Sequence, residues 1–88
     1  MSTTVLHRPM DYDEDKVDEA VLALLYLTMH DDRTATRAWK GYDWDAMDRL
    51  HRKGYIADPK GKAKSVVITE EGKIKAERLF HQLFGKTM

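Results

Sequence analysis

The sequence predicts one small α+β domain, and three observations lead to this prediction. First, apolar residues recur at helical spacing in residues 17–28 and again in residues 76–84. Second, two short runs rich in β-branched and aromatic residues, 55–57 and 65–68, flank the turn-forming residues 58–61. Third, 88 residues leave room for one core, and 42% hydrophobic with 34% charged residues is the composition of an ordinary folded protein.

The first helix is predicted to follow a polar tail. Residues 1–10 show no periodicity, so we expect a flexible tail ahead of a single domain that spans residues 11–85. The acidic residues 11–15 favour a helix start, because carboxylates stabilise the positive end of the helix dipole. The helix is then apolar on two faces, which are formed by Val17, Ala20, Val21, Leu24 and Thr28 and by Leu22, Leu25 and Met29. Such a helix is either central to its domain or shared with a partner chain.

A homodimer is the prediction that follows from the second of these alternatives. A chain of 88 residues builds only a small core, so an interface between two copies would cover apolar surface that one copy leaves exposed. We expect this interface to form through the first helix or the C-terminal helix. The candidate interface residues are Leu22, Leu25, Met29, Leu79 and Leu83.

The segment that leads to the next helix is short. Residues 30–34 are polar and end the first helix, and the stretch between Asp31 and Gly41 leaves little room for another one. We therefore expect an extended segment around residues 37–39 that pairs with a following hairpin. Gly41 breaks this segment, and Asp43 is a suitable N-cap for the helix after it.

A second helix is predicted for residues 44–53. Its polar face contains two acid-before-base pairs at a spacing of four, Asp45 with Arg49 and Asp48 with Arg52. Each pair is expected to stabilise the helix by about 0.2–0.5 kcal/mol. The opposite face is formed by Trp44, Met47, Leu50 and His51.

A β-hairpin and a last helix complete the domain. Gly54 suits the left-handed conformation that ends a helix. Residues 55–57 and 65–68 have strand chemistry, and residues 58–61 have the composition of a type I turn. Thr69 is a fitting N-cap for the last helix. That helix has an amphipathic pattern made by Ala76, Leu79, Phe80, Leu83 and Phe84, and it ends at Gly85.

The order of these elements predicts a small winged-helix-like domain. It contains a long N-terminal helix, a short extended segment, a second helix, a β-hairpin wing and a C-terminal helix. Winged helices commonly bind nucleic acid, and cations on the wing and the second helix would neutralise phosphates. The candidate nucleic-acid-binding residues are Lys60, Lys62, Lys64, Arg49, Arg52 and Lys53. Five phosphate contacts, from the wing lysines with Arg52 and Lys53, would give a salt-dependence slope of about −4.5.

Acidic residues leave a second interpretation open. Asp45 and Asp48 lie on the outward face of the second helix, where they would approach phosphates, and their pairing would occupy Arg49 and Arg52. The wing lysines are also what a solvated turn at a sheet edge prefers. The chain is therefore either a regulatory domain that binds double-stranded DNA, or a protein-interaction module that has lost DNA binding and meets a basic partner.

Charge is distributed unevenly, although the net charge is zero. Residues 1–50 contain 11 acidic and 6 basic side chains, and residues 51–88 contain 9 basic and 4 acidic ones. A chain polarised in this way could bind a polyanion through its basic half, or stack head-to-tail with a partner of opposite sign.

The residue types that catalysis and metal binding need are absent or scattered. There is no cysteine, which excludes disulfides and thiolate sites. Neither Ser2 nor Ser65 has a histidine or acid at a suggestive spacing, and the four histidines form no metal-binding pattern. We predict no catalytic site, no metal site and no cofactor. The longest apolar run, residues 20–27, is too short to span a bilayer, so we expect a cytoplasmic protein with no membrane partner.

Several short motifs resemble a family of small, uncharacterised bacterial proteins that is described as a domain of unknown function. The matching motifs are residues 18–28, 38–41, 43–45, 48–50, 53–56, 62–67 and 69–72. The resemblance covers residues 10–84, implies that translation starts near Met10, and brings no activity or ligand with it. Residues 50–72 are also similar to the wing of winged-helix regulators of the multidrug-resistance and phenolic-acid types. That similarity implies a DNA-binding dimer. This chain departs from those regulators in two ways: their second helix is short or absent here, and the outward face of its recognition helix is acidic.

Overall fold

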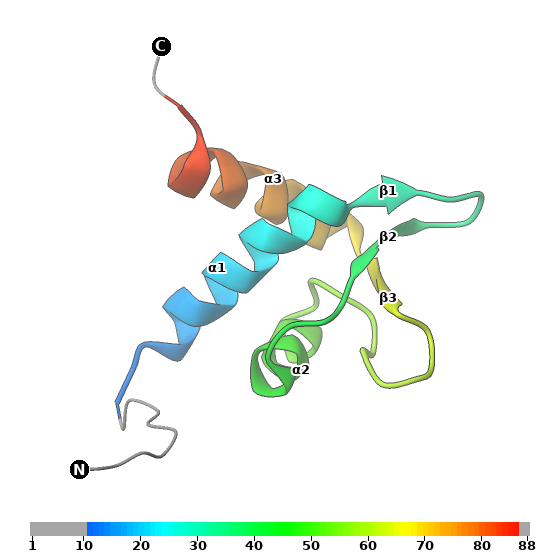
Figure 1. Cartoon of the computed structure of the whole chain (residues 1–88), viewed down its shortest axis with the longest axis horizontal. Coiled ribbons are helices and arrows are strands. Elements are labelled where there is room, and N and C mark those ends of the chain that lie inside the picture. The colour runs from blue at the N-terminus through cyan, green and yellow to red at the C-terminus, as the bar shows by residue number, and fades with distance from the viewer. Residues whose placement is uncertain (1–10, 87–88) are drawn as a thin grey trace.

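The computed structural model describes residues 11–86, which form three α-helices and one three-stranded antiparallel sheet. Helix α1 lies between the other two helices, and the sheet lies at one end of it (Figure 1). The predicted tail, residues 1–10, lies outside the described residues. The elements are α1 Glu14–Leu25, the 3-10 turn η1 Tyr26–Thr28, β1 His30–Asp31, β2 Thr36–Trp39, α2 Trp44–Arg52, β3 Ser65–Ile68 and α3 Glu70–Phe84.

Helix α1 begins where the acidic segment predicted it. The carboxylate of Asp13 accepts a hydrogen bond from the backbone N–H of Lys16 at 3.1 Å, which satisfies one of the free donors at the helix start. The last turn tightens into the 3-10 turn η1 before Met29 extends the chain. Both apolar faces of α1 are covered within the chain, because the helix packs against α3 and against α2.

The position of α1 corrects the predicted dimer interface. Leu22 and Leu25 are 1% and 0% exposed, and Leu79 on α3 is 6% exposed. These three side chains belong to the core of the single chain and are not interface residues. Met29 is half-buried, whereas Leu83 is 50% exposed. The helix is apolar on two sides because it is central to the fold.

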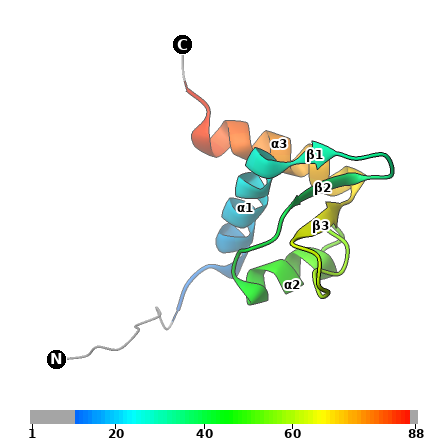
Figure 2. The same cartoon turned by 45° about the vertical axis from the view of Figure 1, so that its right-hand side comes forward.

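The sheet has the order β1-β2-β3, and both pairs of neighbours are antiparallel. Strand β2 aligns Thr36 with Ile68 and Trp39 with Ser65, so the prediction that residues 37–39 pair with the later strand is confirmed. Figure 2 shows β2 between β1 and β3, with α2 below them. Strand β1 was not predicted, since residues 30–34 resemble a helix end. The carboxylate of Asp32 instead holds the tight turn into β2 by accepting backbone hydrogen bonds at 2.7 and 2.9 Å.

The predicted hairpin is only partly formed. Residues 55–57 do not make a strand, and Ile56 forms a single bridge to Ile68. The bridge is made by two hydrogen bonds, from the N–H of Thr69 to the carbonyl of Tyr55 and from the N–H of Ala57 to the carbonyl of Val67. The pairing extends no further at Tyr55, because its N–H donates to the carbonyl of Leu50 in α2, and the carbonyl of Thr69 accepts from the N–H of Lys73 in α3.

The predicted helix boundaries around α2 and α3 are confirmed by their caps. Asp43 accepts a hydrogen bond from the N–H of Ala46 at 3.0 Å, and Thr69 accepts one from the N–H of Gly72 at 3.0 Å. Gly54 has a φ of 85°, the left-handed conformation expected after α2. Gly85 ends α3, with an extended rather than a left-handed backbone.

The apolar face of α2 differs from the prediction in one respect. Met47 and Leu50 are buried with Ala46, but Trp44 at the helix start is 67% exposed. The predicted pair of Asp48 with Arg52 is present, with oxygen and nitrogen 3.7 Å apart. The predicted pair of Asp45 with Arg49 is wrong, because Arg49 turns inward to α1.

Candidate nucleic-acid interface

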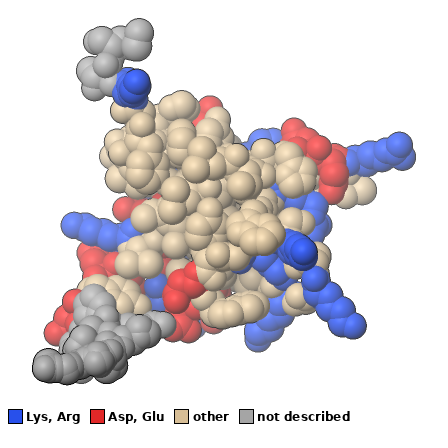
Figure 3. All heavy atoms as spheres, in the orientation of Figure 1, with Lys and Arg blue, Asp and Glu red and all other residues tan. Residues whose placement is uncertain are grey.

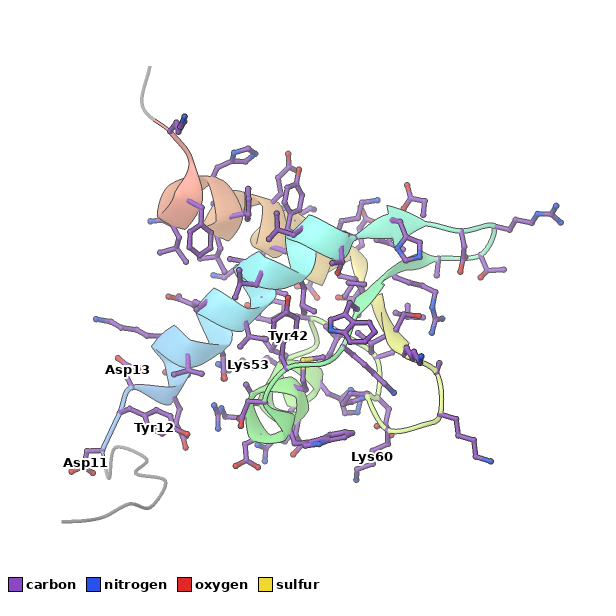
Figure 4. The ribbon with its side chains drawn as sticks, in the orientation of Figure 1. Asp11, Tyr12, Asp13, Tyr42, Lys53 and Lys60 are labelled. Atoms are coloured by element: carbon purple, nitrogen blue, oxygen red, sulfur yellow. The ribbon has the colours of Figure 1, made fainter. Side chains whose placement is uncertain are left out.

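A loop between α2 and β3 carries the three exposed lysines that the sequence singled out. We call residues 57–64 the lysine loop, and its exposed cations are Lys60, Lys62 and Lys64. Within residues 11–86 none of the three takes part in an ion pair. Figure 4 shows that Lys60 extends outward from the loop. Three unpaired ammonium groups on one short segment form a surface that suits anions.

The lysine loop is fixed in place by hydrogen bonds. Asp58 accepts from the backbone N–H of Lys60 at 2.9 Å, and Pro59 is buried. The Lys40 ammonium, at the end of β2, donates to the carbonyls of Pro59 and Gly61 at 2.6 and 3.1 Å. Gly61 has a φ of 136°, a conformation that side chains rarely adopt. The loop therefore presents its lysines from a defined backbone.

Two tryptophans lie near this loop. Trp44 and Lys60 line a groove of about 210 Å³ with Asp45, Asp48 and Pro59. The other, Trp39, is 48% exposed and lies against Gly41, where an added Cβ would be 2.5 Å from the indole nitrogen. The groove therefore combines an aromatic ring with charges of both signs, and it shares Pro59 and Lys60 with the lysine loop.

Two of the predicted nucleic-acid contacts are used inside the fold instead. Asp18 on α1 is only 1% exposed, and Arg49 donates from Nε to both carboxylate oxygens at 2.9 Å. Lys53 donates to Asp18 Oδ2 at 2.8 Å and to Asp15 Oδ1 at 3.0 Å. Lys53 thus lies between α1 and α2 (Figure 4), and both Arg49 and Lys53 are engaged in contacts with α1.

These contacts shift the acidities of the groups involved. Burial raises the pKa of Asp18, but the hydrogen bonds and charges of Arg49 and Lys53 outweigh it and hold this pKa below its ordinary value of 3.8. The hydrogen bond to Asp18 raises the pKa of Arg49 and that of Lys53 above their usual ranges. All three groups are therefore charged near neutral pH and tie α2 to α1.

The remaining predicted cation, Arg52, lies on the surface of α2. Its side chain is 66% exposed and pairs with Asp48, which is 49% exposed, at 3.7 Å. An exposed pair of this kind is weak, so Arg52 can exchange its partner for a phosphate. Of the predicted cations, Lys60, Lys62, Lys64 and Arg52 are therefore exposed without a contact to Asp18, and Lys60 lies beside the acidic residues Asp45 and Asp48 of α2.

Within residues 11–86, the contacts of two histidines are with a backbone carbonyl and with aromatic rings. His51 Nδ1 is 3.2 Å from the carbonyl oxygen of Ile56, and His81 packs edge-on against Tyr26 and Phe80. Across residues 11–86, no three His, Cys, Asp or Glu side chains are grouped as a metal site would require. In the same residues no helix has the length and apolar character needed to cross a membrane.

Comparison with known proteins places the chain in a family. The family described as "Domain of unknown function (DUF6429)" matches residues 13–86. The chain is similar to "Uncharacterized protein y4hR" of Sinorhizobium fredii (strain NBRC 101917 / NGR234), with 56% identity over 77 residues. The aligned region covers 88% of this chain and 100% of that protein. No solved structure matches the chain.

Proposed function

The chain belongs to the DUF6429 family of unknown function, and we propose that it is a non-enzymatic, winged-helix-like domain that binds double-stranded DNA in a regulatory role. The lysine loop would act as the wing, because it lies between α2 and β3 and precedes α3. The observation that carries this proposal is the set of three unpaired lysines, Lys60, Lys62 and Lys64, on a loop that Lys40 fixes in place. The proposed contact is with the phosphate backbone.

Sequence-specific reading through α2 is not part of the proposal. Asp45 and Asp48 occupy the outward side of this helix, and Arg49 is bonded to Asp18. Carboxylates near phosphates weaken binding unless cations compensate them. The lysine loop therefore positions the domain on a duplex without distinguishing one base pair from another.

Charge reversal in the lysine loop tests this proposal. Changing Lys60, Lys62 and Lys64 together to glutamate is expected to weaken binding to a fluorescent DNA duplex on the order of 100-fold, because three phosphate contacts become three repulsions. Fluorescence anisotropy at low salt measures the affinity. The matched control reverses Lys16, Arg33 and Lys86, three exposed cations that lie outside the loop.

The comparison between the two triple variants decides the outcome. Both change the net charge by the same amount, so any general electrostatic effect is shared. Equal losses in the two variants would show that binding depends on net charge and not on the lysine loop. An unchanged affinity in the loop variant would refute the proposed contact.

A protein partner is the second candidate, and the exposure of Trp44 favours it. Tryptophan is enriched among the residues that dominate protein interfaces, and Trp44 is 67% exposed beside Asp45 and Asp48. A basic peptide could stack a cation on the ring and pair with the carboxylates. Titration of the chain into a fluorescently labelled arginine-rich peptide, followed by the fluorescence anisotropy of the label, tests this function. Saturable binding lost in Trp44→Ala, together with no duplex binding, would replace the first proposal by the second.

A homodimer is proposed through an exposed surface that keeps Leu83 but none of the other interface residues suggested by the sequence. Leu27, Leu83 and Phe84 are 63%, 50% and 48% exposed. The ring of Phe84 lies 5.5 Å from that of Phe80, which lies 5.1 Å from Tyr26. Figure 3 shows that side chains other than Lys, Arg, Asp and Glu cover much of the surface over α3 and the C-terminal half of α1, so two copies could meet there without opposing like charges.

Light scattering checks the dimer. The unaltered chain is expected to have a dimer mass at about 100 µM, a concentration at which micromolar association is complete. Leu83→Lys is expected to shift it to a monomer mass. Ile74→Lys is the matched control. Ile74 is also on α3 and is 59% exposed, but it lines a separate groove with Tyr55 and Arg78. A monomer mass for the unaltered chain would refute the dimer.

A further inference from the structure

A cavity lies where the three helices meet, away from the lysine loop. Its volume is about 270 Å³, and Leu22 of α1, Leu50 of α2 and Leu79 of α3 line it together with Tyr55. These side chains give it an apolar floor and one aromatic edge. A concave apolar site with a few polar groups is the usual form of a small-molecule site.

Part of the charged lining is already paired. Asp18 is held by Arg49 and Lys53, and Lys53 also contacts Asp15. These groups therefore satisfy one another, and a ligand would gain little from any of them. They form a rigid charged wall on one side of the cavity.

Two lining groups of opposite charge are left over. Glu19 from α1 and Lys75 from α3 both line the cavity. Within residues 11–86, Glu19 and Lys75 do not pair with each other, and neither forms an ion pair with another side chain. One free carboxylate and one free ammonium group thus flank an apolar floor, on two different helices.

We propose that this cavity binds a small zwitterion with an apolar side chain, such as an aliphatic α-amino acid. The side chain of the ligand lies on the three leucines, its carboxylate pairs with Lys75 and its ammonium group pairs with Glu19. A molecule with a carboxylate alone would leave Glu19 facing an added negative charge. A molecule with an amine alone would place a positive charge near Lys75. Only a ligand with both groups matches both residues.

The binding site is independent of the proposed DNA contact, because it shares no residue with the lysine loop. Its test is a titration of the full chain with leucine, followed by backbone amide shifts in nuclear magnetic resonance spectra. Leucine is expected to bind with a Kd of about 1 mM or tighter. The amide shifts should centre on the cavity residues of α1 and α3. Two analogues separate the contributions: 4-methylpentanoate lacks the ammonium group, and 3-methylbutylamine lacks the carboxylate.

Each analogue is expected to bind at least about tenfold more weakly than leucine, since it loses one charge-assisted hydrogen bond. Lys75→Gln and Glu19→Gln should each weaken leucine binding to a similar degree. The controls, matched by residue type, are Lys73→Gln and Glu77→Gln, which are both on α3 but outside the cavity lining, and they should leave the affinity unchanged. Circular dichroism confirms that each variant is folded.

Several results would overturn the proposal. One is the absence of amide shifts with leucine at about 10 mM, a concentration well above the expected Kd. Another is equal binding of leucine and both analogues. A third is that the cavity variants and the controls change leucine affinity equally. Tighter binding of 4-methylpentanoate than of leucine would assign the cavity to simple carboxylates instead, and would also contradict the role of Glu19.

Discussion

Replacing Gly72 by alanine is expected to lower the free energy of unfolding by about 4 kcal/mol, enough to unfold a small domain. A Cβ at this position would lie 1.9 Å from the carbonyl oxygen of Tyr55 and 2.7 Å from its carbonyl carbon. The obstacle is backbone, and Tyr55 is held by hydrogen bonds to Leu50 and Thr69, so it cannot move without breaking the junction of α2 and α3. Urea denaturation followed by circular dichroism measures the loss.

Gly54→Ala is the control for this prediction. Gly54 has a φ of 85°, but no atom lies within 4 Å of the position of an added Cβ. Its replacement is expected to cost about 1 kcal/mol through backbone strain alone. If Gly54→Ala proved as damaging as Gly72→Ala, the close approach of α3 to Tyr55 would not be what stabilises the junction.

The second large effect is expected at Asp18. Asp18→Asn keeps the shape of the side chain but removes the charge that Arg49 and Lys53 share, and should cost about 3 kcal/mol. This is the low end for a broken buried ion pair, because the Lys53 side chain is 35% exposed and can still pair with Asp15. Asp15→Asn is the matched control. Its side chain is 83% exposed, so the expected loss is below about 1 kcal/mol.

The ion pair also makes stability depend on pH. The pKa of Asp18 is lower in the folded chain than its ordinary value of 3.8. The stabilisation is therefore complete above about pH 4, and is lost as the pH falls through the folded pKa. The difference in unfolding free energy between the unaltered chain and Asp18→Asn should stay constant from pH 6 to about pH 4 and then shrink as the pH falls to 3. A difference that stays constant over the whole interval would show that the charge of Asp18 contributes nothing.

Local signals in the sequence were sufficient to predict most of the secondary structure. Asp43, Gly54 and Thr69 were identified as caps, and each has that role in the structure. Caps can be read from the sequence because they act on neighbours within three or four residues. Strand β1 could not be read in the same way. It contains only His30 and Asp31, and it exists because β2 offers a free edge.

Contacts between distant residues explain the errors at the candidate site. Arg49 was expected to pair with Asp45 on its own helix, whereas it bonds to Asp18, 31 residues earlier. A helical spacing rule cannot anticipate how α1 crosses α2. One signal was available: Asp18 precedes Leu22 and Leu25 at spacings of four and seven, which places it on the same apolar face of the helix, and a carboxylate on such a face needs a cation. The lysines of the loop were predicted correctly as exposed, because turn chemistry is local.

The dependence of duplex affinity on salt tests the central proposal most directly. With Arg49 and Lys53 committed to Asp18, three phosphate contacts from Lys60, Lys62 and Lys64 predict a slope of log K against log salt of about −2.7. Engagement of Arg52 as a fourth contact would make the slope about −3.6. The measurement is a set of anisotropy titrations between about 50 and 200 mM salt, a range over which several phosphate contacts give a clear change in affinity. A slope near −2.7 that flattens when the three lysines are changed to glutamine supports the lysine loop as the DNA contact. Binding that is weak and independent of salt would contradict it.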